Sequence, residues 1–150
     1  MPSGGCLCGA VRFEVTGPLS EIELCHCVRC RKAYGADFAA TLYARRGDFH
    51  WRAGEDAVTT FDAPLRHRPP AYRHCFCATC GSPAPLSWPD LPFVEIPAGL
   101  FDAGDDDPQG RPAYHQFVTQ KAPWHEIADA LPRHDAGAPL DRKVLGSILR

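Results

Sequence analysis

The 150-residue sequence has no apolar run long enough to cross a bilayer, and no apolar segment behind a basic start as in a secretory signal. It has no basic cluster longer than Arg29 to Lys32, and its net charge of -2 and pI near 6.4 argue against a nucleic-acid partner. A glycine-rich phosphate loop and a nucleophile elbow are also absent. We therefore expect a cytoplasmic protein with neither a membrane nor a nucleic acid as partner.

Methionine occurs once, whereas proline occurs 15 times, glycine 13 times and cysteine eight times. Frequent proline and glycine indicate many turns, so we expect many short strands, with helix in the minority. At this length the chain is most simply one domain, residues 1–150, with its own core. A reducing compartment disfavours disulfides, so eight thiols there indicate metal sites more strongly than S–S bonds.

Alternating or β-rich segments predict strands, and one helical pattern closes the chain. The segment 140–149 spaces its apolar residues as one face of a short amphipathic helix within a tail of residues 133–150. Residues 64–70 and 105–107 are expected to be surface loops. The expected strands are 10–15, 21–24, 38–43, 49–51, 58–61, 93–96 and 113–118, with those on either side of Gly54 forming a meander.

Three cysteines crowd into the six residues Cys25-His26-Cys27-Val28-Arg29-Cys30. Their thiols cannot all pair with one another, and a soft, thiolate-binding ion such as zinc fits this spacing best. Two further local pairs, distant in sequence, supply the four thiolates of a closed, structural zinc site: Cys6 with Cys8 and Cys77 with Cys80. In an extended backbone the side chains of Cys6 and Cys8 would point to the same face, with their Cα atoms about 6.6 Å apart.

The second ion, held by Cys25, Cys27 and Cys30, would keep a fourth position for water, a substrate or another ligand. An open position is typical of a catalytic zinc ion, and a three-ligand site can lose its metal. Spacing alone leaves another interpretation open, in which Cys75 or His26 closes the second site and both ions are structural. A framework of disulfides is the remaining alternative.

Four motifs occur in order along the chain: Gly5-Cys6-Leu7-Cys8-Gly9, residues 25–32, Phe76-Cys77-Ala78-Thr79-Cys80-Gly81-Ser82-Pro83, and Lys121-Ala122-Pro123-Trp124. Together they resemble the glutathione-dependent formaldehyde-activating enzyme family, which also contains centromere protein V. The resemblance covers about residues 4–132. It implies a mainly β, zinc-binding β-tent fold of short antiparallel strands, a structural zinc on Cys6, Cys8, Cys77 and Cys80, and a catalytic zinc on Cys25, Cys27 and Cys30.

The family's activity is that of a carbon–sulfur lyase, which joins glutathione to formaldehyde and gives S-hydroxymethylglutathione. By analogy, glutathione or a similar small thiol is the expected partner, with a thiolate formed at the second zinc attacking the aldehyde carbon. His26, or a water that it orders, is the candidate proton donor, and Arg29, Arg31 and Lys32 are candidates to hold the ligand's carboxylates. The competing hypothesis is a non-catalytic binding module stabilised by two structural zinc ions.

Two positions depart from the expected family pattern. Cys75 is an additional thiol, which in a strand would face the same side as Cys77, and Gln120 stands where a serine often precedes the last motif. We interpret that motif, Lys121 to Trp124, as a turn fixed by a buried indole. His26, between two ligands, has the further interpretation of a side chain that points to solvent.

Overall fold

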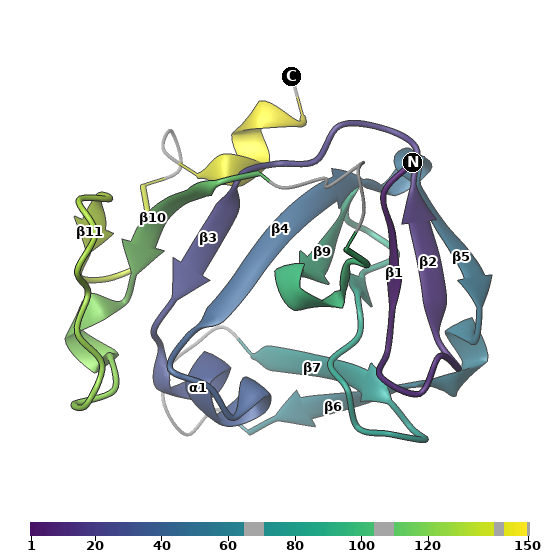
Figure 1. The fold of residues 1–150 in the computed structure, drawn as a ribbon, viewed down its shortest axis with the longest axis horizontal. Helices are drawn as coiled ribbons and strands as arrows, with labels where there is room; N and C mark the ends of the chain where they lie inside the picture. The colour runs from purple at the N-terminus through teal and green to yellow at the C-terminus, as the bar shows by residue number, and fades with distance from the viewer. Residues whose placement is uncertain (65–70, 104–109, 140–142, 150) are drawn as a thin grey trace.

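The computed structural model describes residues 1–64, 71–103, 110–139 and 143–149, and it is mainly β (Figure 1). Three sheets account for the strands. The three-stranded sheet has the order β1-β2-β5, the six-stranded sheet β11-β10-β3-β4-β9-β8, and β6 pairs with β7. The strands are β1 Ser3–Gly5, β2 Arg12–Val15, β3 Ile22–Cys25, β4 Ala39–Arg45, β5 Phe49–Ala53, β6 Val58–Ala63, β7 Tyr72–Cys77, β8 Leu86–Ser87, β9 Phe93–Pro97, β10 Pro112–Gln116 and β11 Arg133–His134.

Helix is sparse, as expected. The described residues contain one α-helix, α1 Val28–Tyr34, which ends where Gly35 takes a left-handed conformation (φ 58°). The remaining turns of helix are of the 3-10 type: η1 Arg46–Asp48, η2 Glu55–Ala57, η3 Ala98–Leu100, η4 Val118–Gln120 and η6 Val144–Ser147. None of the described helices has the length and apolar character needed to span a membrane.

All seven expected strands exist, but two details differ. The strands β5 and β6, which flank Gly54, do not form a meander, because β5 pairs with β2 and β6 with β7. Gly54 explains the separation: its φ is 70°, and a Cβ there would lie 2.0 Å from the Ala10 carbonyl oxygen, so the chain turns tightly against another segment. The pairings of β10 with β3 and with β11 are parallel.

The core lies on both faces of β4, because successive side chains of a strand point to opposite sides. Leu42 and Ala44 face an apolar cluster with the three-stranded sheet, which includes Phe13. Tyr43 faces the other way and packs near Tyr114 in a second cluster.

The C-terminal segment completes this second cluster. Val144 and Ile148 are buried there, so the predicted apolar face packs against the core. The predicted amphipathic helix itself is only one short 3-10 helix. Leu140 of the predicted helix lies outside the described residues, as do the predicted loop residues 65–70 and the acidic turn 105–107.

Candidate metal centres

Four thiols from two distant parts of the chain converge at the first candidate centre. The ligand atoms of Cys6, Cys8, Cys77 and Cys80 all lie within 4.8 Å of one another. The Sγ of Cys8 is 3.5 Å from that of Cys6 and 3.9 Å from that of Cys77. Sulfur ligands on a tetrahedral zinc, each at about 2.3 Å, lie about 3.8 Å apart, so this donor set fits zinc.

Turns, and not a strand, deliver the first pair. The strand β1 ends at Gly5, and Cys6 to Gly9 form a turn in which Gly9 has φ 80°. The expected extended geometry of Cys6 and Cys8 is therefore wrong, because the Gly9 N–H donates to the Cys6 carbonyl at 3.0 Å and closes a turn that contains both cysteines. The Val11 backbone N–H donates to Cys6 Sγ at 3.2 Å and fixes the first thiol.

The second pair follows β7. Cys77 ends that strand and is fully buried, and the chain then turns at Gly81, whose φ of 75° matches the predicted turn under the metal. The Gly81 N–H donates to the Cys77 carbonyl at 2.8 Å. The backbone N–H of Leu7 donates to Ser82 Oγ at 3.0 Å and ties the two turns together.

The second candidate centre has three sulfurs. Cys25 ends β3, Cys27 is the N-cap of α1, and Cys30 lies in its first turn, with their Sγ atoms within 4.8 Å of one another. Cys27 Sγ accepts a hydrogen bond from the Cys30 N–H at 3.3 Å. Among the described residues, no fourth His, Cys, Asp or Glu extends this group.

The electrostatics of this group call for a cation. Contact with Cys27 is the largest influence that raises the pKa of Cys25, to about 12, and contact with Cys25 raises the pKa of Cys30 well above its usual range. Three neighbouring thiols cannot ionise together without a compensating charge. A bound divalent ion provides that charge and would hold all three as thiolates.

Cys75 belongs to neither group. It lies on β7, is 8% exposed and has Thr60 Oγ1 3.6 Å from its sulfur, and burial raises the pKa of its thiol. The interpretation in which Cys75 closes the second centre therefore finds no support in the described geometry.

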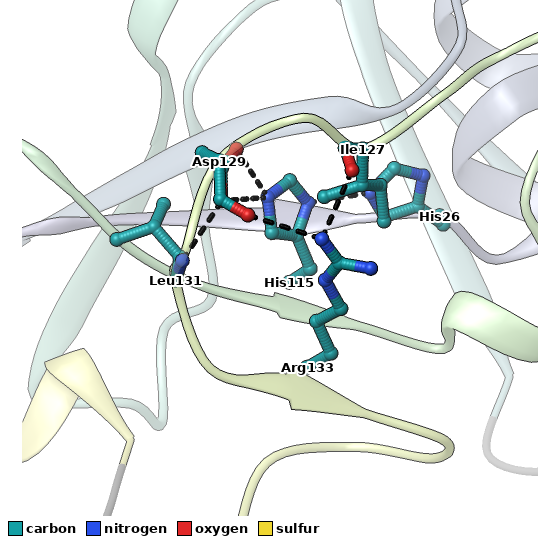
Figure 2. Close-up of polar contacts among 6 residues, drawn as sticks. All are labelled: His26, His115, Ile127, Asp129, Leu131 and Arg133. Carbon is teal, nitrogen blue, oxygen red and sulfur yellow. Dashed lines mark hydrogen bonds and ion pairs between the residues drawn. The ribbon is translucent and has the colours of Figure 1, made fainter.

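His26 does not point to solvent. It is completely buried, and its Nε2 lies 2.8 Å from His115 Nδ1 (Figure 2). Burial is the main influence that lowers the pKa of His26, to about 4, so the imidazole is neutral at pH 7. A ring of aromatic neighbours, His115, His125 and Phe38, surrounds it.

Two of the three basic candidates share one cleft, and Lys32 also lines a second hollow with Arg31. Arg29 and Lys32 line a cleft of about 480 Å³ together with Tyr72 and His74. Arg31 lies elsewhere: its Nη1 donates to the Gln120 carbonyl at 2.9 Å, and its guanidinium stacks 5.6 Å from the Trp124 ring centre.

The segment around Trp124 corrects another expectation. The indole is 71% exposed and not buried, and its Nε1 donates to Asp37 Oδ1 at 2.8 Å. The turn is held instead by Lys121, whose Nζ donates to the His125 carbonyl at 2.8 Å. Gln120 has a role that the sequence did not show, since its Oε1 accepts the Val28 N–H at 3.0 Å in the first turn of α1.

Tyr72 is the other residue that sequence reasoning missed. Its hydroxyl donates to Cys30 Sγ at 3.7 Å, and its ring lines the cleft below Arg29. The Tyr72 side chain therefore contacts both the cleft and Cys30, although none of the three cysteines lines the cleft itself. Tyr72 follows the proline-rich segment 64–70, and no spacing rule links it to Cys30.

Comparisons with known proteins agree with these observations. The model of the family described as glutathione-dependent formaldehyde-activating enzyme matches residues 1–120. A Halomonas elongata protein, whose name assigns it provisionally to the glutathione-dependent formaldehyde-activating enzymes, is 31% identical over 131 residues, covering 83% of this chain and 79% of that protein. A crystal structure of a Rhodobacter sphaeroides protein is 28% identical, with a TM-score of 0.50, and the match covers 73% of this chain and 97% of that one.

Proposed function

Since this chain belongs to the glutathione-dependent formaldehyde-activating enzyme family, we propose that it is a zinc-dependent enzyme of carbon–sulfur lyase type that joins a small thiol to an aldehyde. Glutathione and formaldehyde are the proposed substrates. We assign one structural zinc to the four-sulfur group and one catalytic zinc to the three-sulfur group, and both donor sets fit this metal.

The observation that carries the proposal is the position of the cleft. The Tyr72 side chain lines it and also reaches Cys30 Sγ, so we infer that this one side chain separates a ligand in the cleft from the group that has only three sulfurs. A zinc ion held by Cys25, Cys27 and Cys30 would supply Lewis acidity, which favours the thiolate form of a small thiol near neutral pH.

Arg29 and Lys32 would bind the carboxylates of a glutathione-like ligand. Both line the cleft from α1, and a guanidinium can pair with a carboxylate through two hydrogen bonds. Arg29 is 9% exposed and stacks 5.1 Å from the centre of the Tyr72 ring, which limits the directions in which it can donate. Arg31, engaged with Gln120 outside this cleft, is less well placed for this role.

Tyr72 is the proposed donor to the aldehyde oxygen, for which its single O–H would turn away from Cys30 Sγ. Burial raises the pKa of its hydroxyl, so it stays protonated and can donate to an oxygen on which negative charge develops. In the overall reaction the thiol sulfur forms a bond to the aldehyde carbon, the C=O double bond becomes a C–O single bond, and the thiol proton ends on that oxygen. No oxidant or reductant is needed.

His26, the first candidate for proton transfer, has less support for direct contact with substrate. Its complete burial and its bond to His115 support a role in holding the metal-binding segment.

The test compares two cysteine variants in zinc-loaded protein. Cys27→Ser should hold one zinc per chain, keep the fold and lose turnover of glutathione and formaldehyde, measured by NMR exchange above the spontaneous rate. Cys75→Ser is the matched control, because Cys75 is also buried but lies outside both groups. It should hold two zinc ions and keep the parent rate.

A different result would support the binding-module hypothesis. It requires that the parent protein shows no turnover above the spontaneous rate, and that Cys27→Ser lowers only the melting temperature.

A further inference from the structure

A line of hydrogen bonds leads from His26 to a segment beyond the part of the chain that the family model matches (Figure 2). His26 Nε2 lies 2.8 Å from His115 Nδ1, and His115 Nε2 lies 3.0 Å from Asp129 Oδ2. The two imidazoles are buried, whereas the Asp129 side chain is 47% exposed. The line thus joins the interior beside the three-sulfur group to the surface.

Asp129 is itself held in place. The Leu131 N–H donates to its Oδ1 at 2.9 Å, and Arg133 Nη2 donates to the backbone carbonyls of Asp129 and Ile127 at 3.0 and 2.9 Å (Figure 2). The first of these bonds is the largest influence that lowers the pKa of the Asp129 carboxyl. A fixed carboxylate therefore ends the line.

The carboxylate determines the direction of the outer hydrogen bond. An ionised carboxylate only accepts, so His115 donates to Asp129 through Nε2. The other ring nitrogen of His115, Nδ1, then faces Nε2 of His26. Nδ1 of His26 has no hydrogen-bond partner among the described residues. The arrangement fixes the ring orientation of His26.

In the sequence His26 lies between two of the three sulfur ligands, Cys25 and Cys27, so the way in which His26 is held affects the position of both. Its backbone N–H donates to the Gln116 carbonyl at 3.0 Å, and its side chain is held by His115. His26 is thus held by β10 at two points, and neither its ring nor its backbone can move without the other. We propose that His115 and Asp129 are positioning residues, which act through His26 to hold Cys25 and Cys27 in metal-binding geometry. This inference rests on the proposed second metal site.

The three-sulfur group needs such support more than the four-sulfur group. Each ligand contributes a larger share of the affinity when only three are present, and a ligand that must be ordered on binding lowers that affinity. Removing the outer partner of a residue that orients metal ligands typically costs about 10- to 100-fold in affinity. Because Asp129 is half-exposed, we expect the lower end of that range.

The experiment measures zinc release from the zinc-loaded protein to a coloured chelator. The parent should release its two zinc ions in two phases. Asp129→Ala should accelerate one phase about tenfold and leave the other unchanged. Asp129→Asn keeps an oxygen that can accept from His115, so its rate should fall between those of the parent and the alanine variant.

Asp135→Ala is the matched control. Asp135 is an exposed carboxylate of the same segment, and its backbone carbonyl, which accepts from Thr119 Oγ1, is kept in the variant. Both of its release phases should match those of the parent. The cobalt-substituted Asp129→Ala protein should also show a weaker d–d absorption from one of its two sites, which a general loss of stability would not produce selectively.

The inference is overturned if Asp129→Ala releases zinc at the parent rates, or if both phases are accelerated equally and the melting temperature falls. Either result leaves the proposed function standing. If the parent holds only the zinc of the four-sulfur group, the second metal site and the proposed function fall together with the inference.

Discussion

Replacing Glu95 by glutamine should stabilise the protein increasingly as the pH rises. The Glu95 carboxyl, on β9, is enclosed, although the residue as a whole is partly exposed. Burial is the main influence that raises its pKa from the usual 4.5 to about 7, with a further contribution from Glu23 and an opposing one from Lys143.

The size of the effect follows from proton linkage. Because the folded-state pKa is raised, the favourable contribution of the protonated group is fully present below pH 4.5 and is lost as the pH rises through about 7. A rise in pKa from 4.5 to about 7 corresponds to about 3 kcal/mol at pH values above 7. Glutamine cannot ionise and escapes this loss. The variant should therefore be more stable than the parent by about 1 kcal/mol near pH 5 and by about 3 kcal/mol near pH 8.

Urea unfolding of the zinc-loaded parent and variant between roughly pH 5 and pH 8 measures the difference. Both proteins lose the same zinc on unfolding, so the pH dependence of metal binding cancels. Glu55→Gln, at an exposed position, is the control and should stay within about 0.5 kcal/mol of the parent at every pH. A parent–variant difference that does not change with pH for Glu95→Gln would refute the reasoning.

Two further variants test the supports of the metal groups. Gln120→Ala removes the acceptor of the Val28 N–H, so it should cost about 1 kcal/mol in unfolding free energy and speed hydrogen exchange of that amide, with the amides of β9 unchanged as the internal reference. Cys77→Ser removes a fully buried ligand of the four-sulfur group, and a structural zinc supplies about 10 to 16 kcal/mol. It should lose the fold by circular dichroism, and a cooperative melt like that of the parent would contradict a structural role.

The sequence was most informative where structure is local. Gly35 ends α1 and Gly81 turns beneath the cysteines, because a positive φ is a property of one residue and its neighbours. The grouping of Cys77 with Cys80 follows from spacing in the same way. The strands were found because alternation is visible within a few residues.

Contacts between distant segments could not be predicted. His115 meets His26 because β10 lies parallel to β3, and a parallel pairing leaves no signal in either strand. Tyr72 reaches Cys30 only after the chain has passed through three strands and returned. Trp124 was expected inside because indoles are usually buried, whereas here Asp37 holds it at the surface.

The strand β7 joins the two metal groups mechanically. Tyr72 begins the strand beside the three-sulfur group, and Cys77 ends it as a ligand of the four-sulfur group. Five residue steps of strand separate them, about 17 Å at about 3.3 Å per residue. Its pairing with β6 extends over that whole length, from Cys77 opposite Val58 to Tyr72 opposite Ala63. A metal ion bound by the four-sulfur group would therefore do more than stabilise its own turn, because it would also fix one end of the strand whose other end carries Tyr72 beside Cys30.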